Sequence, residues 1–227
     1  MPEKKEVQIL PPLLPRGVIL DMDGLMLDTE RLYTKIFERV SSETGRPVPM
    51  AIIEKTIGMN DDDSEILYKE KMGADFPYRK IWKAVLNEVY NYAENKGLPH
   101  RPGLMVLLDK LESLSIPLAV ATSTSSENAR WRLERAGILH RFKAFAFGNE
   151  VKNTKPDPEI FLLALDRLGI KAEDCIGFED SPAGLLGLKA AGIRSVFIKD
   201  LAEPSPEILS NVWRTCTDLE EAALLFG

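Results

Sequence analysis

Two aspartates, Asp21 and Asp23, carry the clearest chemical signal in this chain of 227 residues. They follow an apolar run at residues 17–20, and Gly24 comes next, where the lack of a side chain lets a ligand approach the backbone. Both carboxylates reach one site if the strand unwinds there. One can then attack as a nucleophile while the other transfers protons, provided that their environments differ. The alternative is a solvated turn after a strand.

A second acidic pair, Glu179 and Asp180, also follows an apolar run. Taken alone, Asp180 is explained as a cap for the helix that follows it. Combined with Asp21 and Asp23 at a neighbouring strand end, the four acids instead predict an oxygen-ligand cage for Mg²⁺. That ion keeps several waters and takes one or two carboxylates plus substrate phosphate.

A site this acidic needs donors if its substrate is an anion. Thr122, Ser123 and Thr124 offer hydroxyls and turn amides before a helix that begins near Ser126, which would form a cradle for phosphate. Lys155 precedes another helix and is held by adjacent prolines, and a rigid cation binds phosphate better than a free one. The alternatives are ordinary helix capping and a solvated surface lysine.

The elements that position these residues alternate between strand and helix, which predicts a doubly wound α/β fold with a parallel sheet. The predicted strands are residues 17–20, 116–121, 143–148, 174–178 and 195–198. The predicted helices, with apolar residues at i, i+3 and i+4, are residues 104–113, 126–136, 158–168 and 182–190. Ligands bind beyond the carboxyl ends of strands in such sheets, where the polar clusters stand.

Residues 34 to about 100 interrupt this alternation with helical spacing alone. The predicted helices of this segment are residues 33–40, 51–57, 63–72 and 78–95. A loop with glycine and proline at both ends, residues 97–103, bounds it. We therefore expect a discontinuous catalytic core, residues 1–33 and 102–227, and an inserted all-helical domain, residues 34–101, that acts as a lid.

The composition, 44% hydrophobic and 28% charged, is that of a globular protein with a real core. The net charge of −6 argues against nucleic-acid or anionic-membrane partners. Two cysteines, Cys175 and Cys216, match no metal or redox spacing, and no apolar run is long enough to span a bilayer. These features predict a cytoplasmic protein, and a monomer is the expected state.

Four motifs occur in order along the chain: residues 21–30 (DMDGLMLDTE), 122–123 (TS), 155–158 (KPDP) and 177–184 (GFEDSPAG). One motif alone would be a weak signal, because the Asp-x-Asp pattern at its start is common. Together they resemble the signature of the haloacid dehalogenase (HAD) superfamily, closest to its β-phosphoglucomutase-like phosphatases, and the resemblance spans essentially the whole chain. It implies a Rossmann-like core, a mobile helical cap, and hydrolysis of a small phosphorylated metabolite such as a sugar, polyol or nucleotide phosphate.

The resemblance also implies a role for each site residue. Asp21 would form an aspartyl-phosphate, and Asp23 would protonate the leaving oxygen and then activate water. Mg²⁺ would be bound by the Asp21 carboxylate, the Asp23 backbone carbonyl and Asp180, with Glu179 ligating directly or through water. The substrate-binding residues would be Gly24, Thr122, Ser123 and Lys155.

Three alternatives to a phosphatase follow from the same motifs. Dehalogenases lack the second aspartate, so Asp23 and the acidic pair at 179–180 argue against that branch. β-Phosphoglucomutases carry a histidine and an arginine where this chain has Tyr33 and the acidic run 61–63, which would repel a second phosphate unless it merely opens a helix. A non-catalytic phosphate-binding protein would lack the nucleophile or a metal-binding acid, and neither is missing.

Overall fold

The computed structural model describes residues 14–57, 59, 61–201 and 203–227. Its contacts group into two compact units. The core unit contains the chain up to Leu25, Arg101–Ala129 and Arg141–Gly227, and the helical unit contains Met26–His100 and Arg130–His140. The domain boundaries at residues 33/34 and 101/102 stay a prediction.

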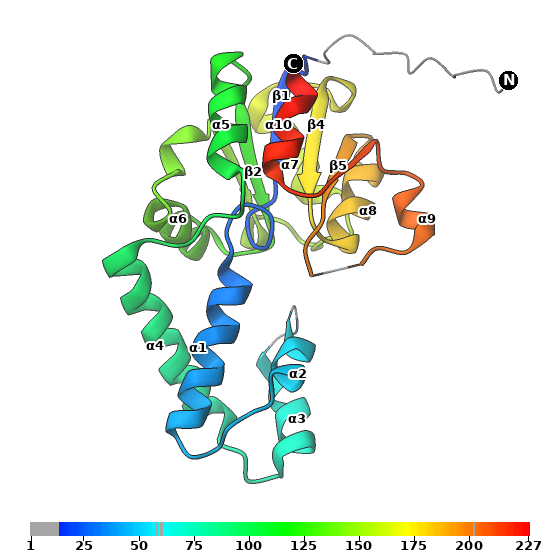
Figure 1. Cartoon of the computed structure of the whole chain (residues 1–227). Helices are drawn as coiled ribbons and strands as arrows, with labels where there is room; N and C mark the ends of the chain where they lie inside the picture. Colours follow the sequence, from blue (N-terminus) through cyan, green and yellow to red (C-terminus); the bar gives the residue numbers. More distant parts are fainter. Residues whose placement is uncertain (1–13, 58, 60, 202) are drawn as a thin grey trace, which may run out of the picture. The chain divides into compact units, whose positions relative to one another are not determined.

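Within the described residues, the core unit holds one sheet of six parallel strands in the order β3-β2-β1-β4-β5-β6 (Figure 1). The strands are β1 (Gly17–Leu20), β2 (Leu118–Thr122), β3 (Ala144–Phe147), β4 (Cys175–Glu179), β5 (Arg194–Ile198) and β6 (Arg214–Cys216). Ile19 of β1 is in register with Ala119 of β2 and Gly177 of β4. The carboxyl ends of these three neighbouring strands therefore lie side by side.

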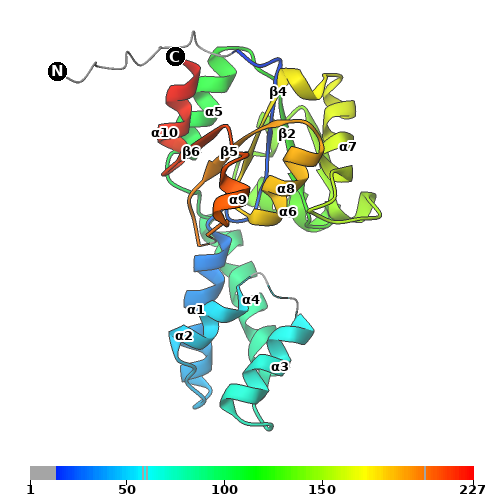
Figure 2. The same ribbon diagram turned by 90° about the vertical axis from the view of Figure 1, so that its right-hand side faces the viewer.

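Helices cover both faces of this sheet, which is why β1, β2 and β4 are buried along their whole lengths. The helices that begin in the core unit are α5 (Leu104–Ser113), α6 (Ser126–Arg135), α7 (Glu159–Leu168), α8 (Pro182–Ala190), α9 (Pro206–Leu209) and α10 (Leu219–Ala223). Figure 2 shows α5 and α10 on one face and α7 on the other. The α/β fold is confirmed.

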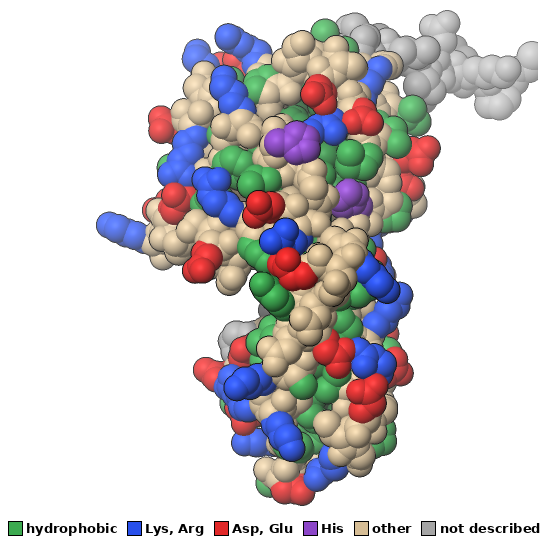
Figure 3. Space-filling model, turned by 90° about the vertical axis from the view of Figure 1, so that its left-hand side faces the viewer, with side chains coloured by type: hydrophobic (Ala, Val, Ile, Leu, Met, Phe, Trp, Pro, Cys, Tyr) green, Lys and Arg blue, Asp and Glu red, His purple; other side chains and the backbone are tan. Residues whose placement is uncertain are grey.

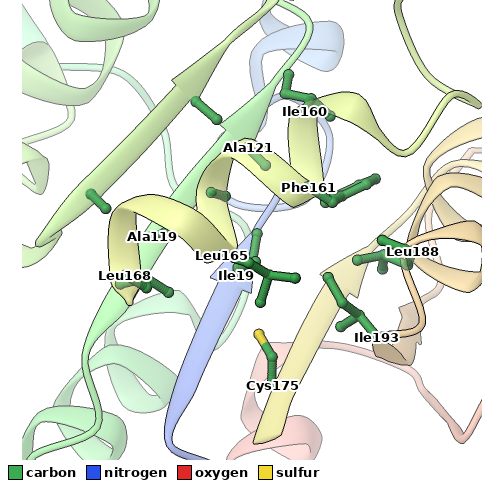
Figure 4. Close-up of a cluster of buried hydrophobic side chains, with 14 residues drawn as sticks. Ile19, Ala119, Ala121, Ile160, Phe161, Leu165, Leu168, Cys175, Leu188 and Ile193 are labelled. Atoms are coloured by element: carbon green, nitrogen blue, oxygen red, sulfur yellow. The ribbon is translucent and has the colours of Figure 1, made fainter. Parts of the chain in front are cut away.

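One hydrophobic cluster joins the sheet to α7 and α8 (Figure 4). Ala119 and Ala121 of β2 are small, which leaves room for Phe161 and Leu165 of α7 to pack against the strands. Gly177 serves the same purpose under α8, because a Cβ there would lie 2.3 Å from the Leu188 side chain. Close packing of the helices thereby fixes where their first turns meet the strand ends.

The helical unit contains α1 (Thr29–Glu43), α2 (Met50–Ile53), α3 (Asp61–Met72) and α4 (Tyr78–Lys96). Stacked aromatic rings form its interior, with ring centroids 4.9 Å apart for Phe37 and Tyr68 and 5.2 Å apart for Tyr68 and Tyr78. On the face shown in Figure 3, acidic and basic side chains lie among one another. Among the described residues, no helix has both the length and the apolar character needed to cross a membrane.

The sequence patterns did not reveal β6, α9 and α10. Two of the three β6 residues, Arg214 and Thr215, are exposed, so this edge strand has no apolar run. Both helices are four or five residues long, too short for a helical period to show. The α1 helix begins at Thr29 rather than at residue 33, so its first two residues are the last two of the first motif.

Candidate active site

Lys155 lies at the centre of a buried charged cluster in the core unit. Its Nζ donates to Asp21 Oδ1 at 2.5 Å, to Glu179 Oε1 at 2.6 Å and to the carbonyl oxygen of Ala121 at 2.9 Å. An ammonium group has three N–H donors, so these acceptors use all of them. The side chains of Lys155 and Glu179 are 6% and 0% exposed. The lysine is therefore fixed at one point beyond the strand ends.

Burial and charge shift the titration of this cluster. Burial raises the pKa of Asp21 to about 8; Lys155 opposes the shift, and Glu179 and Asp23 add to it. Burial by itself would lower the pKa of Lys155, but its attraction to Asp21 and Glu179 outweighs this and raises the pKa. One lysine faces several carboxylates, so the site favours a further cation.

Glu179 is held from its other side by the start of α8. Its Oε2 accepts hydrogen bonds from the backbone N–H groups of Asp180 and Ser181, both at 3.1 Å, and from Ser181 Oγ at 3.0 Å. Ser181 also caps α8 by accepting from the N–H of Gly184, so the cap is Ser181 and not Asp180. A Cβ on Gly184 would lie 1.9 Å from the Glu179 carboxyl carbon, so α8 approaches this carboxylate as only glycine allows.

Three carboxylates could hold a metal ion here. Asp21, Glu179 and Asp180 each offer one oxygen, and these oxygens lie within 4.8 Å of one another. The backbone turns at Gly24 with φ +85°, where a Cβ would lie 2.3 Å from Asp180 Oδ2, so this turn packs directly against Asp180. A set made only of carboxylate oxygens suits a hard cation such as Mg²⁺.

Asp23 lies in a different setting from Asp21. It is half-buried, and its Oδ2 accepts a hydrogen bond of 2.8 Å from the hydroxyl of Thr124 in the loop after β2. One aspartate of the pair thus contacts a buried lysine and the other contacts a neutral hydroxyl. This division satisfies the requirement that a nucleophile and a proton-transfer group have different environments.

The remaining predicted residues lie at the end of β2 and in the loop that follows it. Thr122 is buried, and its Oγ1 accepts a hydrogen bond of 3.1 Å from the Thr124 N–H, while Ser123 is exposed. Thr124 was predicted only as one donor of a phosphate cradle. No local pattern could reveal its bond to Asp23, because the two residues are 101 positions apart.

The structure therefore brings the predicted residues together in the core unit, beyond the ends of β1, β2 and β4. Asp21, Lys155, Glu179 and Asp180 form the charged cluster, and Gly24 packs on Asp180. The end of β2 and the loop after it, residues 122–124, join the site through the bond between Thr124 and Asp23. The roles of these residues stay a prediction at this point.

Comparison with known proteins supplies the context for this arrangement. Residues 18–198 match the model of the family described as haloacid dehalogenase-like hydrolase. The chain is 35% identical over 181 residues to the phosphorylated carbohydrates phosphatase of Thermotoga maritima, which covers 80% of this chain and 83% of that protein. It is 29% identical over 187 residues to the β-phosphoglucomutase of Bacillus subtilis, covering 80% and 82% of the two chains.

The fold is likewise similar to a solved structure. The crystal structure of CbbY from Rhodobacter sphaeroides in complex with phosphate superposes with a TM-score of 0.69 and 25% sequence identity. The match covers 92% of this chain and 99% of that one. It extends over both units of the chain rather than the sheet alone.

Proposed function

Because this chain belongs to the haloacid dehalogenase-like hydrolase family and is a phosphoric monoester hydrolase, we propose that it is a Mg²⁺-dependent phosphatase of small phosphomonoesters. Phosphorylated sugars are the favoured substrates, since the relative from T. maritima is a phosphatase of phosphorylated carbohydrates. Polyol and nucleotide phosphates remain within the proposed class. The observation that carries the proposal is the buried contact of Lys155 with Asp21 and Glu179 beside a third carboxylate, Asp180.

In the proposed reaction, Asp21 attacks the phosphorus atom and forms an aspartyl-phosphate. Lys155 already lies 2.5 Å from Asp21 Oδ1, so a phosphoryl group transferred to Asp21 arrives beside a fixed cation. The hydroxyl of Thr122 and the amides of its loop are the proposed neutral donors to the phosphoryl oxygens. A preorganised cation and donors stabilise charge in the transition state without reorganising.

Asp23 is the proposed proton-transfer group. It gives a proton to the ester oxygen as the bond from phosphorus to that oxygen breaks, and the alcohol leaves. The resulting carboxylate then takes a proton from the water that attacks the aspartyl-phosphate, which releases inorganic phosphate and restores both aspartates. Its contact with the Thr124 hydroxyl, rather than with Lys155, supports this separate role.

The residues that would hold Mg²⁺ are Asp21, the backbone carbonyl of Asp23, and Asp180, with Glu179 contributing directly or through water. Glu179 Oε2 already accepts three hydrogen bonds and Oε1 accepts one from Lys155 Nζ, so Oε1 is the oxygen with more capacity left for the ion or for a bridging water. When bound, the ion supplies positive charge that offsets the negative charge of the phosphoryl group and of the surrounding carboxylates.

A β-phosphoglucomutase activity is the second candidate, since the B. subtilis relative is such an enzyme. The acidic run 61–63, which argued against a mutase, is explained by its place in a helix. It forms the first turn of α3, where negative charge is favourable, and Asp62 pairs with Arg79. An assay that detects both released phosphate and the isomerised product therefore distinguishes hydrolysis from isomerisation.

The deciding experiment measures phosphate release from a panel of phosphomonoesters in Mg²⁺ and in EDTA. The panel includes β-glucose 1-phosphate, coupled to detection of glucose 6-phosphate. Release that depends on Mg²⁺ is the expected result. Isomerisation with little release would replace the phosphatase by the mutase, and silence across the panel would favour a phosphate-binding protein.

A further inference from the structure

A side-chain hydrogen bond links the loop after β1 to the loop after β2: Thr124 Oγ1 donates to Asp23 Oδ2 at 2.8 Å. We infer that Thr124 is a positioning residue, which holds the Asp23 carboxyl group in the orientation needed to transfer protons. This inference rests on the proposed phosphatase function. It assigns Thr124 to proton transfer rather than to phosphate binding.

The position of Thr124 is set by contacts that do not involve Asp23. Its N–H donates to Thr122 Oγ1, and its carbonyl oxygen accepts a hydrogen bond of 3.1 Å from the N–H of Gly148, just after β3. Gly148 packs so closely on this loop that a Cβ there would lie 2.0 Å from the Ser123 carbonyl oxygen. Strands β2 and β3 therefore anchor Thr124, and it can restrain Asp23 instead of following it.

Neighbouring contacts tighten the same loop. The N–H of Ser126, the first residue of α6, donates to Asn149 Oδ1 at 2.8 Å, and Asn149 Nδ2 donates to Ser126 Oγ at 3.2 Å. Thr124 and Ser126 thus each have a hydrogen-bond partner in residues 148–149. A carboxyl group held by such a fixed donor is already oriented, so it loses little further orientational freedom when the reaction takes place.

A hydroxyl is suited to this task because it can donate to a carboxylate and accept from a carboxylic acid. Asp23 passes through both forms in the proposed reaction, when it protonates the ester oxygen and when it receives a proton from water. Thr124 can remain bonded to it throughout. An amide N–H or an ammonium group at this position could only donate.

The inference predicts a dependence on the leaving group. A phenolate such as p-nitrophenolate departs without receiving a proton, whereas an alkoxide requires one. A misplaced Asp23 therefore slows the first step for alkyl esters and leaves p-nitrophenyl phosphate almost unaffected. Because kcat/KM reports the steps up to the aspartyl-phosphate, this parameter isolates the effect.

The test compares wild type, Thr124→Val and Thr124→Ser in Mg²⁺ with p-nitrophenyl phosphate and β-glycerol phosphate. Thr124→Val keeps the side-chain shape and removes the hydroxyl. We expect it to lower kcat/KM for β-glycerol phosphate ~10- to 100-fold and for p-nitrophenyl phosphate less than ~3-fold, within the usual contribution of acid catalysis. Thr124→Ser, which restores the hydroxyl, should recover most of the loss.

Equal losses for both esters, or a loss confined to KM, would overturn the inference and return Thr124 to phosphate binding. So would a Thr124→Ser variant as impaired as Thr124→Val. Unchanged kcat/KM for the alkyl ester would also overturn it while leaving the phosphatase proposal standing. A wild-type enzyme that hydrolyses neither ester, nor any other ester of the panel, would overturn both.

Discussion

Lys155 donates to Glu179 across the middle of the sheet, with Nζ and Oε1 2.6 Å apart. The lysine comes from the segment after β3, at one edge, and Glu179 ends β4, on the far side of β1. The same Nζ also donates to the carbonyl oxygen of Ala121 in β2 and to the carboxyl group of Asp21 after β1. One cation thereby ties together the carboxyl ends of three neighbouring strands.

Replacing this lysine should cost stability as well as activity. Lys155→Ala leaves the carboxyl groups of Asp21 and Glu179 buried without their cation, which should lower the free energy of unfolding by about 3 kcal/mol. Urea unfolding in EDTA measures this, and Mg²⁺ should restore part of the loss. Lys152→Ala, an exposed lysine of the same segment, should change stability by less than ~0.5 kcal/mol. Equal behaviour of the two variants would contradict the buried ion pair.

Asp21→Asn should fold normally and have no phosphatase turnover, because an amide oxygen cannot form a stable phosphoryl intermediate. Phosphate release in Mg²⁺, with circular dichroism as the folding control, measures this. Asp166→Asn, an exposed carboxylate on α7, is the matched control and should keep full activity. Turnover retained by Asp21→Asn would refute the assignment of the nucleophile.

The same variant should alter how stability depends on pH in EDTA. Burial raises the pKa of Asp21 from 3.8 to about 8, so between these values the folded state holds a proton that the unfolded chain has lost. The contribution of Asp21 to the stability of the wild type therefore falls as pH rises through that range. Asp21→Asn has no such proton. Its melting temperature should therefore rise relative to that of the wild type as pH increases from about 5 to about 8. A difference independent of pH would show that Asp21 is not shifted upward.

Two glycines of α8 offer a separate test of the Glu179 contact. Gly184→Ala places a Cβ 1.9 Å from the Glu179 carboxyl carbon, whereas Gly187→Ala meets the Phe161 ring at 2.8 Å in the core. Both should lower the melting temperature. Only Gly184→Ala should also reduce kcat of the folded enzyme, because Glu179 holds Lys155. Similar kcat values for the two variants would argue that the site tolerates displacement of Glu179.

The two thiols should be unreactive in the folded protein. Cys175 and Cys216 are buried, and burial raises the pKa of Cys175 to about 12 and that of Cys216 to about 11, so little thiolate exists near neutral pH. Ellman's reagent at pH 8 should label neither quickly, and both should react in denaturant. Rapid labelling of either thiol in the native protein would contradict its burial.

The local sequence determined much of this protein. Apolar runs such as residues 17–20 and helical spacing such as residues 158–168 specify the parallel sheet and its helices, because both signals depend only on neighbours a few residues apart. The apolar runs placed Asp21 and Glu179 at strand ends, and the order of the motifs added Lys155 to the same site. The edge strand β6 was not predicted, because two of its three residues are polar and exposed and so form no apolar run.

The tertiary structure decided how these residues divide the chemistry. Asp21 contacts Lys155 and Asp23 contacts Thr124. This assignment depends on the strand order and on the close approaches at Gly148 and Gly184. Thr124 and Asp23 are 101 residues apart, and no short-range pattern encodes their contact. The sequence therefore names the reactive groups, and the packing of β1, β2 and β4 assigns each its environment, because pKa and orientation are set by neighbours in space.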